Sequence, residues 1–186
     1  MTRHITHAGL AALVLLFGAG PARADLTGFI GGSNQSQSPG AVVSSNPEHS
    51  FRTTTGLAVG FGLLIVGFEV EWAHTGGDSL GDNACSDVRV TCVPSLTTVM
   101  GNLLVQTPRG VLPLQLYGTV GAGGYRERYS PFDQNDYGFG TNLGGGAKIN
   151  LVGPLRLRLD YRIFKLGNDS YHGTPQRFYA GANISF

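Results

Sequence analysis

Residues 155–164, L-R-L-R-L-D-Y-R-I-F, alternate between apolar and charged side chains. Successive side chains of a β-strand point to opposite faces, so this segment has one apolar face and one charged face. A soluble barrel turns the apolar face inward, and a membrane barrel turns it towards lipid. The direction of this face therefore decides between two classes of protein. The apolar face consists of Leu155, Leu157, Leu159, Tyr161 and Ile163.

The same period of two recurs along the chain between turn signals, which predicts an all-β protein. Glycine and proline mark short connections at 107–111 and 152–154, and 63–64 is also short. Long polar stretches at 34–50, 76–95, 127–136 and 167–176 separate the other neighbours. The eight predicted strands cover 26–33, 51–62, 65–75, 96–106, 112–126, 137–151, the opening segment at 155–164, and 177–186.

Short and long connections alternate, which is typical of an eight-stranded antiparallel transmembrane β-barrel. In such a barrel the short turns are periplasmic, the four longer loops are extracellular, and both termini lie on the periplasmic side. The apolar faces of several strands run for nine to eleven residues, the length that a tilted strand needs to cross a bilayer. The alternative is a soluble periplasmic lipocalin-like binder with an apolar interior.

In the membrane barrel the charged faces would meet inside. Eight strands leave a narrow interior that side chains fill, and buried charges persist there only if they are paired and hydrogen-bonded. We therefore expect acids on the third strand to face bases on the seventh. The predicted lumen charge cluster consists of Glu69, Glu71, Lys148, Arg156, Arg158, Asp160 and Arg162.

Aromatic residues lie near the strand ends on the apolar faces, as in the two interfacial girdles of membrane barrels. The preference of aromatic residues for strands would also place them there. The predicted interfacial residues are Phe51, Trp72 and Tyr137 near the loops and Phe61 near the turns.

Residues 1–24 have the features of a secretory signal peptide: an early Arg3, an apolar run at 8–19, and the small residues Ala22 and Ala24 before a cleavage site. The apolar run is too short for a transmembrane helix. Cleavage would leave one barrel domain at 25–186. Removing Arg3 and Arg23 from the 13 basic residues leaves 11, against 12 acidic ones, so we expect no nucleic-acid partner.

Two cysteines, Cys85 and Cys92, lie in the second long loop. In an exported chain such a pair predicts a local disulfide that staples the loop. A metal site would need further ligands, and we expect no cofactor.

The signal peptide, the eight alternating segments and the terminal R-F-Y-A-G-A-N-I-S-F resemble the small OmpA-like, opacity-type outer-membrane β-barrel proteins. The resemblance implies location in the cell outer membrane. It also implies that Phe178, Ile184 and Phe186 form the signal read by the barrel-insertion machinery. The peptidoglycan-binding domain of OmpA is not carried over.

Glycine runs at 121–124 and 138–146 lack the strand-to-helix context of a nucleotide site, so we expect them to relieve crowding in the barrel wall. Histidines could serve a lipid A-modifying enzyme, but no triad spacing supports catalysis. We expect His74 to be interfacial. The loop residues His49, with Glu48, and His172, with Asp169 and Ser170, are expected to be solvated.

The sequence thus predicts a monomeric, non-enzymatic barrel with a structural or surface-interaction role. Extracellular loops would carry recognition of a ligand that the sequence does not identify. Outer-membrane lipid and lipopolysaccharide would surround the barrel. The alternatives are a small porin-like pore, a lipid A-modifying enzyme and the soluble binder.

Overall fold

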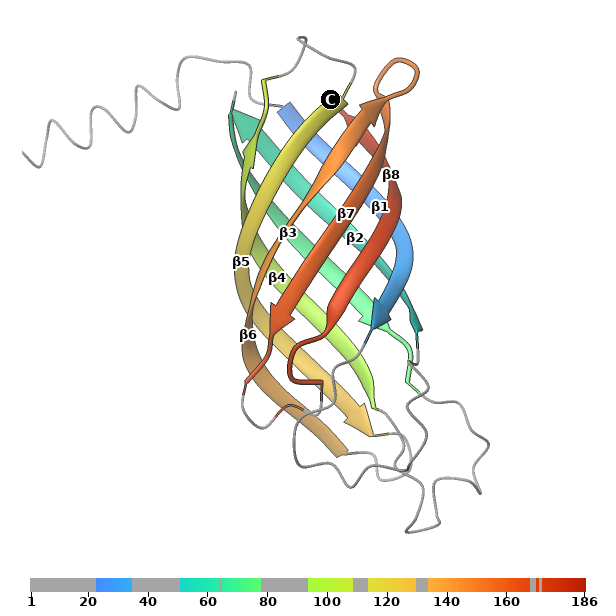
Figure 1. The fold of residues 1–186 in the computed structure, drawn as a ribbon, viewed down its shortest axis with the longest axis vertical. Coiled ribbons are helices and arrows are strands. Elements are labelled where there is room, and N and C mark those ends of the chain that lie inside the picture. The colour runs from blue at the N-terminus through green and yellow to red at the C-terminus, as the bar shows by residue number, and fades with distance from the viewer. Residues whose placement is uncertain are drawn as a thin grey trace, which may run out of the picture.

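The computed structural model describes residues 23–34, 51–63, 65–77, 94–108, 114–129, 134–167, 170 and 172–186. Their strands form one closed antiparallel barrel in chain order, with β1 pairing with β8 (Figure 1). The predicted fold is therefore confirmed. The strands are β1 (Arg23–Asn34), β2 (Arg52–Leu63), β3 (Val66–Thr75), β4 (Ser95–Gln106), β5 (Leu114–Tyr129), β6 (Gln134–Asn150), β7 (Leu155–Lys165) and β8 (Gln176–Ser185).

Apolar side chains cover the outside of the barrel. The apolar face of β7 points outward, with Tyr161 43% and Ile163 42% exposed, whereas Arg158 and Arg162 are fully buried. This arrangement is the reverse of a soluble barrel. The lipocalin-like alternative is therefore wrong, because its interior would have to be apolar. Among the described residues, no helix is long and apolar enough to cross a membrane.

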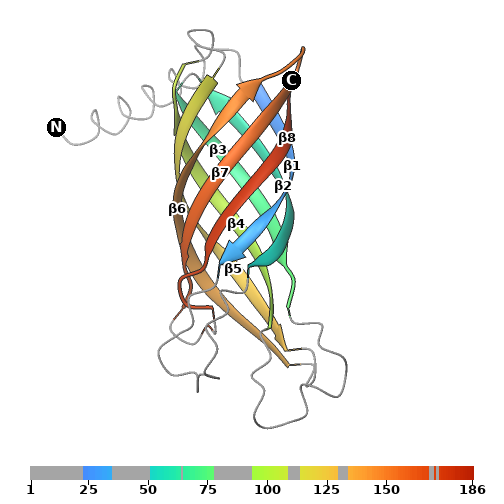
Figure 2. The ribbon, with the colours of Figure 1, turned by 45° about the vertical axis from the view of Figure 1, so that its right-hand side comes forward.

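Strands β5 and β6 are longer at their loop ends than predicted. The predicted strands end at Arg126 and resume at Tyr137, but pairing continues to Tyr129 opposite Gln134. Figures 1 and 2 show both strands reaching beyond the others at this end. The additional residues are mostly polar on both faces, so they lose the apolar alternation while the backbone ladder continues.

Strand β1 also begins earlier than predicted, at Arg23. Ala24 exchanges two backbone hydrogen bonds with Phe186, of 2.9 and 3.0 Å. The expected cleavage after Ala24 falls inside this strand, and residues 1–22 of the expected signal peptide lie outside the described residues.

Two inward-facing glycines of β6 leave room for lumen side chains. A Cβ on Gly146 would lie 2.2 Å from the carbonyl oxygen of Leu159 and 2.6 Å from the hydroxyl of Tyr117. A Cβ on Gly144 would lie 2.3 Å from the carbonyl oxygen of Tyr161. Such separations are too short for any side chain, so this part of the glycine run is required by close approach in the wall.

Candidate functional site

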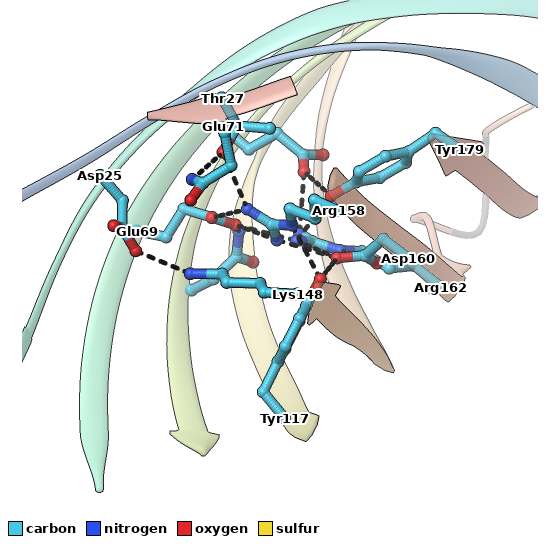
Figure 3. A network of polar contacts seen from close by, with 12 residues as sticks. Asp25, Thr27, Glu69, Glu71, Tyr117, Lys148, Arg158, Asp160, Arg162 and Tyr179 are labelled. Atoms are coloured by element: carbon cyan, nitrogen blue, oxygen red, sulfur yellow. Dashed lines mark hydrogen bonds and ion pairs between the residues drawn. The ribbon is translucent and has the colours of Figure 1, made fainter. Parts of the chain in front are cut away.

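The lumen holds a cluster of charged side chains that come from strands far apart in the sequence (Figure 3). Every second residue of β3 and β7 points inward, which brings Glu69 and Glu71 opposite Arg158, Asp160 and Arg162. All five are at most 6% exposed. We call these five residues the central cluster.

Arg158 lies at the middle of the central cluster. Its guanidinium forms an ion pair with Glu69 and another with Asp160, with a distance of 2.8 Å between Nη2 of Arg158 and Oδ2 of Asp160. Its Nε donates to the hydroxyl of Tyr117 at 2.7 Å, and that hydroxyl donates to Asp160. The guanidinium group of Arg158 thus donates to acceptors on both of its sides, the geometry that satisfies a buried arginine.

Arg162 connects the same acids to a second group. It approaches Glu69 at 2.8 Å, Asp160 at 2.9 Å and Glu71 at 3.1 Å. Glu71 also pairs with Arg177 at 3.2 Å and accepts a hydrogen bond from Tyr179 at 2.9 Å. The three acids Glu69, Glu71 and Asp160 are therefore matched by three arginines.

A smaller group lies nearer the turn end. Lys148 is 2.7 Å from Asp25, and Arg156 pairs with the other oxygen of the same carboxylate. Gln115 accepts a hydrogen bond from Arg156 at 3.3 Å. The structure thus brings all seven sequence-predicted lumen charges into the interior, in two groups.

Sequence reasoning did not include four members of this network: Asp25, Tyr117, Arg177 and Tyr179. The period of two could have placed Tyr117, Arg177 and Tyr179 on the lumen face, since they alternate with outward residues. Asp25 was overlooked because it directly follows the expected cleavage site, where no alternation is visible.

An apolar layer lies above the charges, at the loop end of the lumen. It consists of buried side chains from β4, β5 and β7 and from the residue after β7: Leu96, Met100, Tyr125, Phe164 and Leu166. The guanidinium of Arg177 lies 4.5 Å from the ring centre of Phe164, so the layer rests directly on the charged network. Charges and apolar side chains together fill the lumen.

The expectation that His172 and Ser170 are solvated is wrong. Both are buried, at 1% and 3% exposure, and both contact Glu127 on β5. The hydroxyl of Ser170 donates to Oε1 of Glu127 at 2.7 Å, and Nδ1 of His172 lies 2.5 Å from the same oxygen. The extension of β5 places this carboxylate where the last loop folds over it.

This arrangement differs from a catalytic triad, in which a histidine lies between the nucleophile and the acid. Here the serine hydroxyl contacts the carboxylate directly. His49 and Asp169 lie outside the described residues. His74 is on the outer face, with Nδ1 3.0 Å from the hydroxyl of Thr97. Among the described residues, no group of three or more His, Cys, Asp or Glu side chains could hold a metal ion.

The aromatic residues predicted for the interfaces all lie on the outer surface. Near the loops, Phe51 is 69% exposed, Trp72 46% and Tyr137 73%. At the turn end, Phe61 stacks on Phe68, with 5.3 Å between the ring centres. The terminal residues Phe178, Ile184 and Phe186 also point outward, at 52%, 43% and 71% exposure. Cys85 and Cys92 lie outside the described residues.

An apolar outer wall around a charged, filled lumen defines the class of small eight-stranded membrane barrels. A family model described as "Outer membrane protein beta-barrel domain" matches residues 9–186, so the chain belongs to that family. A search of curated protein sequences gave no match.

Three solved structures share the fold at low identity. Neisserial surface protein A is 12% identical with a TM-score of 0.67, over 88% of this chain and 97% of that one. The N-terminal barrel of Pseudomonas aeruginosa OprF is 12% identical with a TM-score of 0.58, over 88% and 97%. Ail, the attachment invasion locus protein of Yersinia pestis, is 15% identical with a TM-score of 0.54, over 90% and 99%.

Proposed function

We propose that the protein is a non-conducting outer-membrane barrel with a structural or surface-interaction role, whose extracellular loops carry recognition. The filled lumen supports this proposal best. Buried ion pairs and an apolar layer succeed one another along the barrel axis, so ions would meet a desolvated segment. The porin-like pore is therefore the weaker alternative, and we propose no enzymatic activity.

Planar-bilayer recording tests this proposal. The refolded protein should insert without producing steady conductance, while a porin treated in the same way gives stable steps. Folding is checked separately on a denaturing gel, where a closed barrel migrates differently before and after boiling. Steady channels from protein that shows this heat-dependent shift would contradict the proposal.

The second long loop is the first place to look for recognition. We propose that a disulfide between Cys85 and Cys92 orders it. Replacing both cysteines by serine should leave the heat-dependent gel shift unchanged, because neither cysteine belongs to one of the eight strands that form the wall. Peptide mapping without reductant should find the two cysteines joined in the parent protein. Failure of the double variant to form a barrel would show that the disulfide supports the wall instead.

We also propose that residues 1–24 are a cleaved signal peptide and that the mature chain begins at Asp25. Mass spectrometry of protein from outer membranes should then give the mass of residues 25–186. A mass that includes Arg23 and Ala24 would contradict cleavage after Ala24, and the mature protein would then keep the hydrogen bonds between Ala24 and Phe186.

In this proposal the barrel is a monomer surrounded by outer-membrane lipid and lipopolysaccharide. Phe178, Ile184 and Phe186 contact the insertion machinery during assembly.

A further inference from the structure

The outer wall is not uniformly bulky. An apolar groove of about 750 Å³ crosses it from β2 to β6. This volume lies within the roughly 300–1,000 Å³ of small-molecule pockets. The groove's exposed lining is almost entirely apolar, which suits an apolar ligand. It is continuous with the other outward apolar side chains of the barrel wall.

The groove follows one row of register partners. Its members pair in sequence across five strands: Val59 with Val70, Val70 with Gly101, Gly101 with Ala122, and Ala122 with Thr141. The two middle members of this row, Gly101 and Ala122, have the smallest side chains, and they lie between the larger Val70 and Thr141. The parallel row on the turn side remains bulky, with the stacked Phe61 and Phe68 followed by Leu103 and Val120.

The small residue at the middle of the groove is not required by packing of the barrel. A Cβ on Gly101 would meet only the carbonyl oxygen of Ala122, at 3.8 Å, an ordinary contact. Gly146 differs, since a Cβ there would lie 2.2 Å from a carbonyl oxygen. Strand packing therefore does not require glycine at position 101, and the missing side chain leaves a hollow in the outer surface.

The row ends at a positive charge. The register partner of Thr141 on the next strand is Lys165, which points outward and is exposed at the loop end of β7. The strands are inclined to the barrel axis (Figure 2), so a row of register partners runs obliquely, from the turn half of β2 at Val59 to the loop end of β7 at Lys165. Four steps of about 4.8 Å put ~19 Å of wall between Val59 and Thr141 along this oblique row, a path similar in length to the thickness of one leaflet of a core ~30 Å thick.

We propose that this groove binds an acyl chain of lipid A, the phosphorylated lipid of lipopolysaccharide, with Lys165 holding a phosphate. The loop end faces the outer leaflet, where that lipid resides. A phosphomonoester carries about −1.5 to −2 charges near pH 7, which favours it over a phosphodiester beside an ammonium group. This proposal rests on membrane placement and is independent of whether the lumen conducts.

Native mass spectrometry of the full mature barrel tests the site. Detergent-solubilised protein is titrated separately with diphosphoryl lipid A and with phosphatidylglycerol. We expect one lipid A per barrel, bound at least tenfold more tightly than phosphatidylglycerol. Equal affinities would overturn the assignment to lipid A.

Matched variants locate the binding. Gly101→Leu fills the groove, and Gly118→Leu places the same side chain on an outward glycine of β5 away from the groove lining. Lys165→Gln removes the proposed phosphate ligand, and Arg126→Gln removes another outward cation. We expect Gly101→Leu and Lys165→Gln each to weaken lipid A binding at least fivefold, and their controls to change it less than twofold.

Equal losses for Gly101→Leu and Gly118→Leu would overturn the groove as the site. Unchanged affinity in Lys165→Gln would overturn the role of the lysine. The heat-dependent gel shift of each variant shows that the measured protein is folded.

Discussion

Replacing Arg158 by methionine should lower the free energy of unfolding by about 3–5 kcal/mol, because it leaves buried acids without their charge partner. Arg158 is fully buried and contacts Glu69, Asp160 and Tyr117. Urea titration in lipid vesicles, followed by fluorescence of the single tryptophan Trp72, measures the change.

Two variants control this experiment. Arg126→Met removes an outward, exposed arginine and should change stability by no more than about 0.5 kcal/mol. The double variant Glu69→Met with Arg158→Met leaves two buried acids, Glu71 and Asp160, matched by two arginines, Arg162 and Arg177. It should therefore recover at least half of the loss. A loss in Arg158→Met no larger than that in Arg126→Met would show that the ion pairs contribute little.

Replacing Gly146 by valine should prevent barrel closure, because the wall leaves no room for a side chain there. The first added carbon would meet the carbonyl oxygen of Leu159 at 2.2 Å and the hydroxyl of Tyr117 at 2.6 Å. Relief would require β6 and β7 to separate, with loss of their hydrogen bonds. Quantifying the unboiled folded band after refolding measures the effect, and we expect less than a tenth of the parent yield.

Gly118→Val is the matched control, since valine has the same strand propensity at both positions. A Cβ on Gly118 would meet only the carbonyl oxygen of Gly144, at 4.0 Å. This variant should refold to the parent yield. Normal refolding of Gly146→Val would mean that the wall adapts, and that glycine is not needed beside Tyr117.

The alternation of residue types predicted both the strands and their faces. In β7 the assignment of Arg156 and Arg158 to one side and Leu155 to the other follows from the period of two, which a closed sheet enforces on every strand. The same rule placed Glu69 opposite the β7 arginines. We could predict that the charged face of β7 points into the lumen because a row of four charged side chains cannot be placed against lipid.

Other features could not be predicted because they depend on three-dimensional approach. The alternation in β7 places Phe164 on the inward face. However, nothing in the sequence indicates that inward apolar residues from several strands pack together, so the apolar layer was not predicted. The burial of His172 depends on Glu127, 45 positions earlier, and on how the last loop folds back. The groove at Gly101 depends on the register among five strands, which no single strand reveals.

The pairing of β1 with β8 has a consequence for the order of assembly. This seam joins the first and last strands, and the hydrogen bond from Asn183 to Thr27 spans 156 positions. Such distant contacts form late, because the entropy of closing the intervening chain must be overcome first. Until then the lumen is open to water, which solvates the acids and bases separately. Pairing of β1 with β8 therefore closes the barrel and excludes water from the lumen in the same step. A chain that lacks β8 can neither close the barrel nor exclude water from its interior.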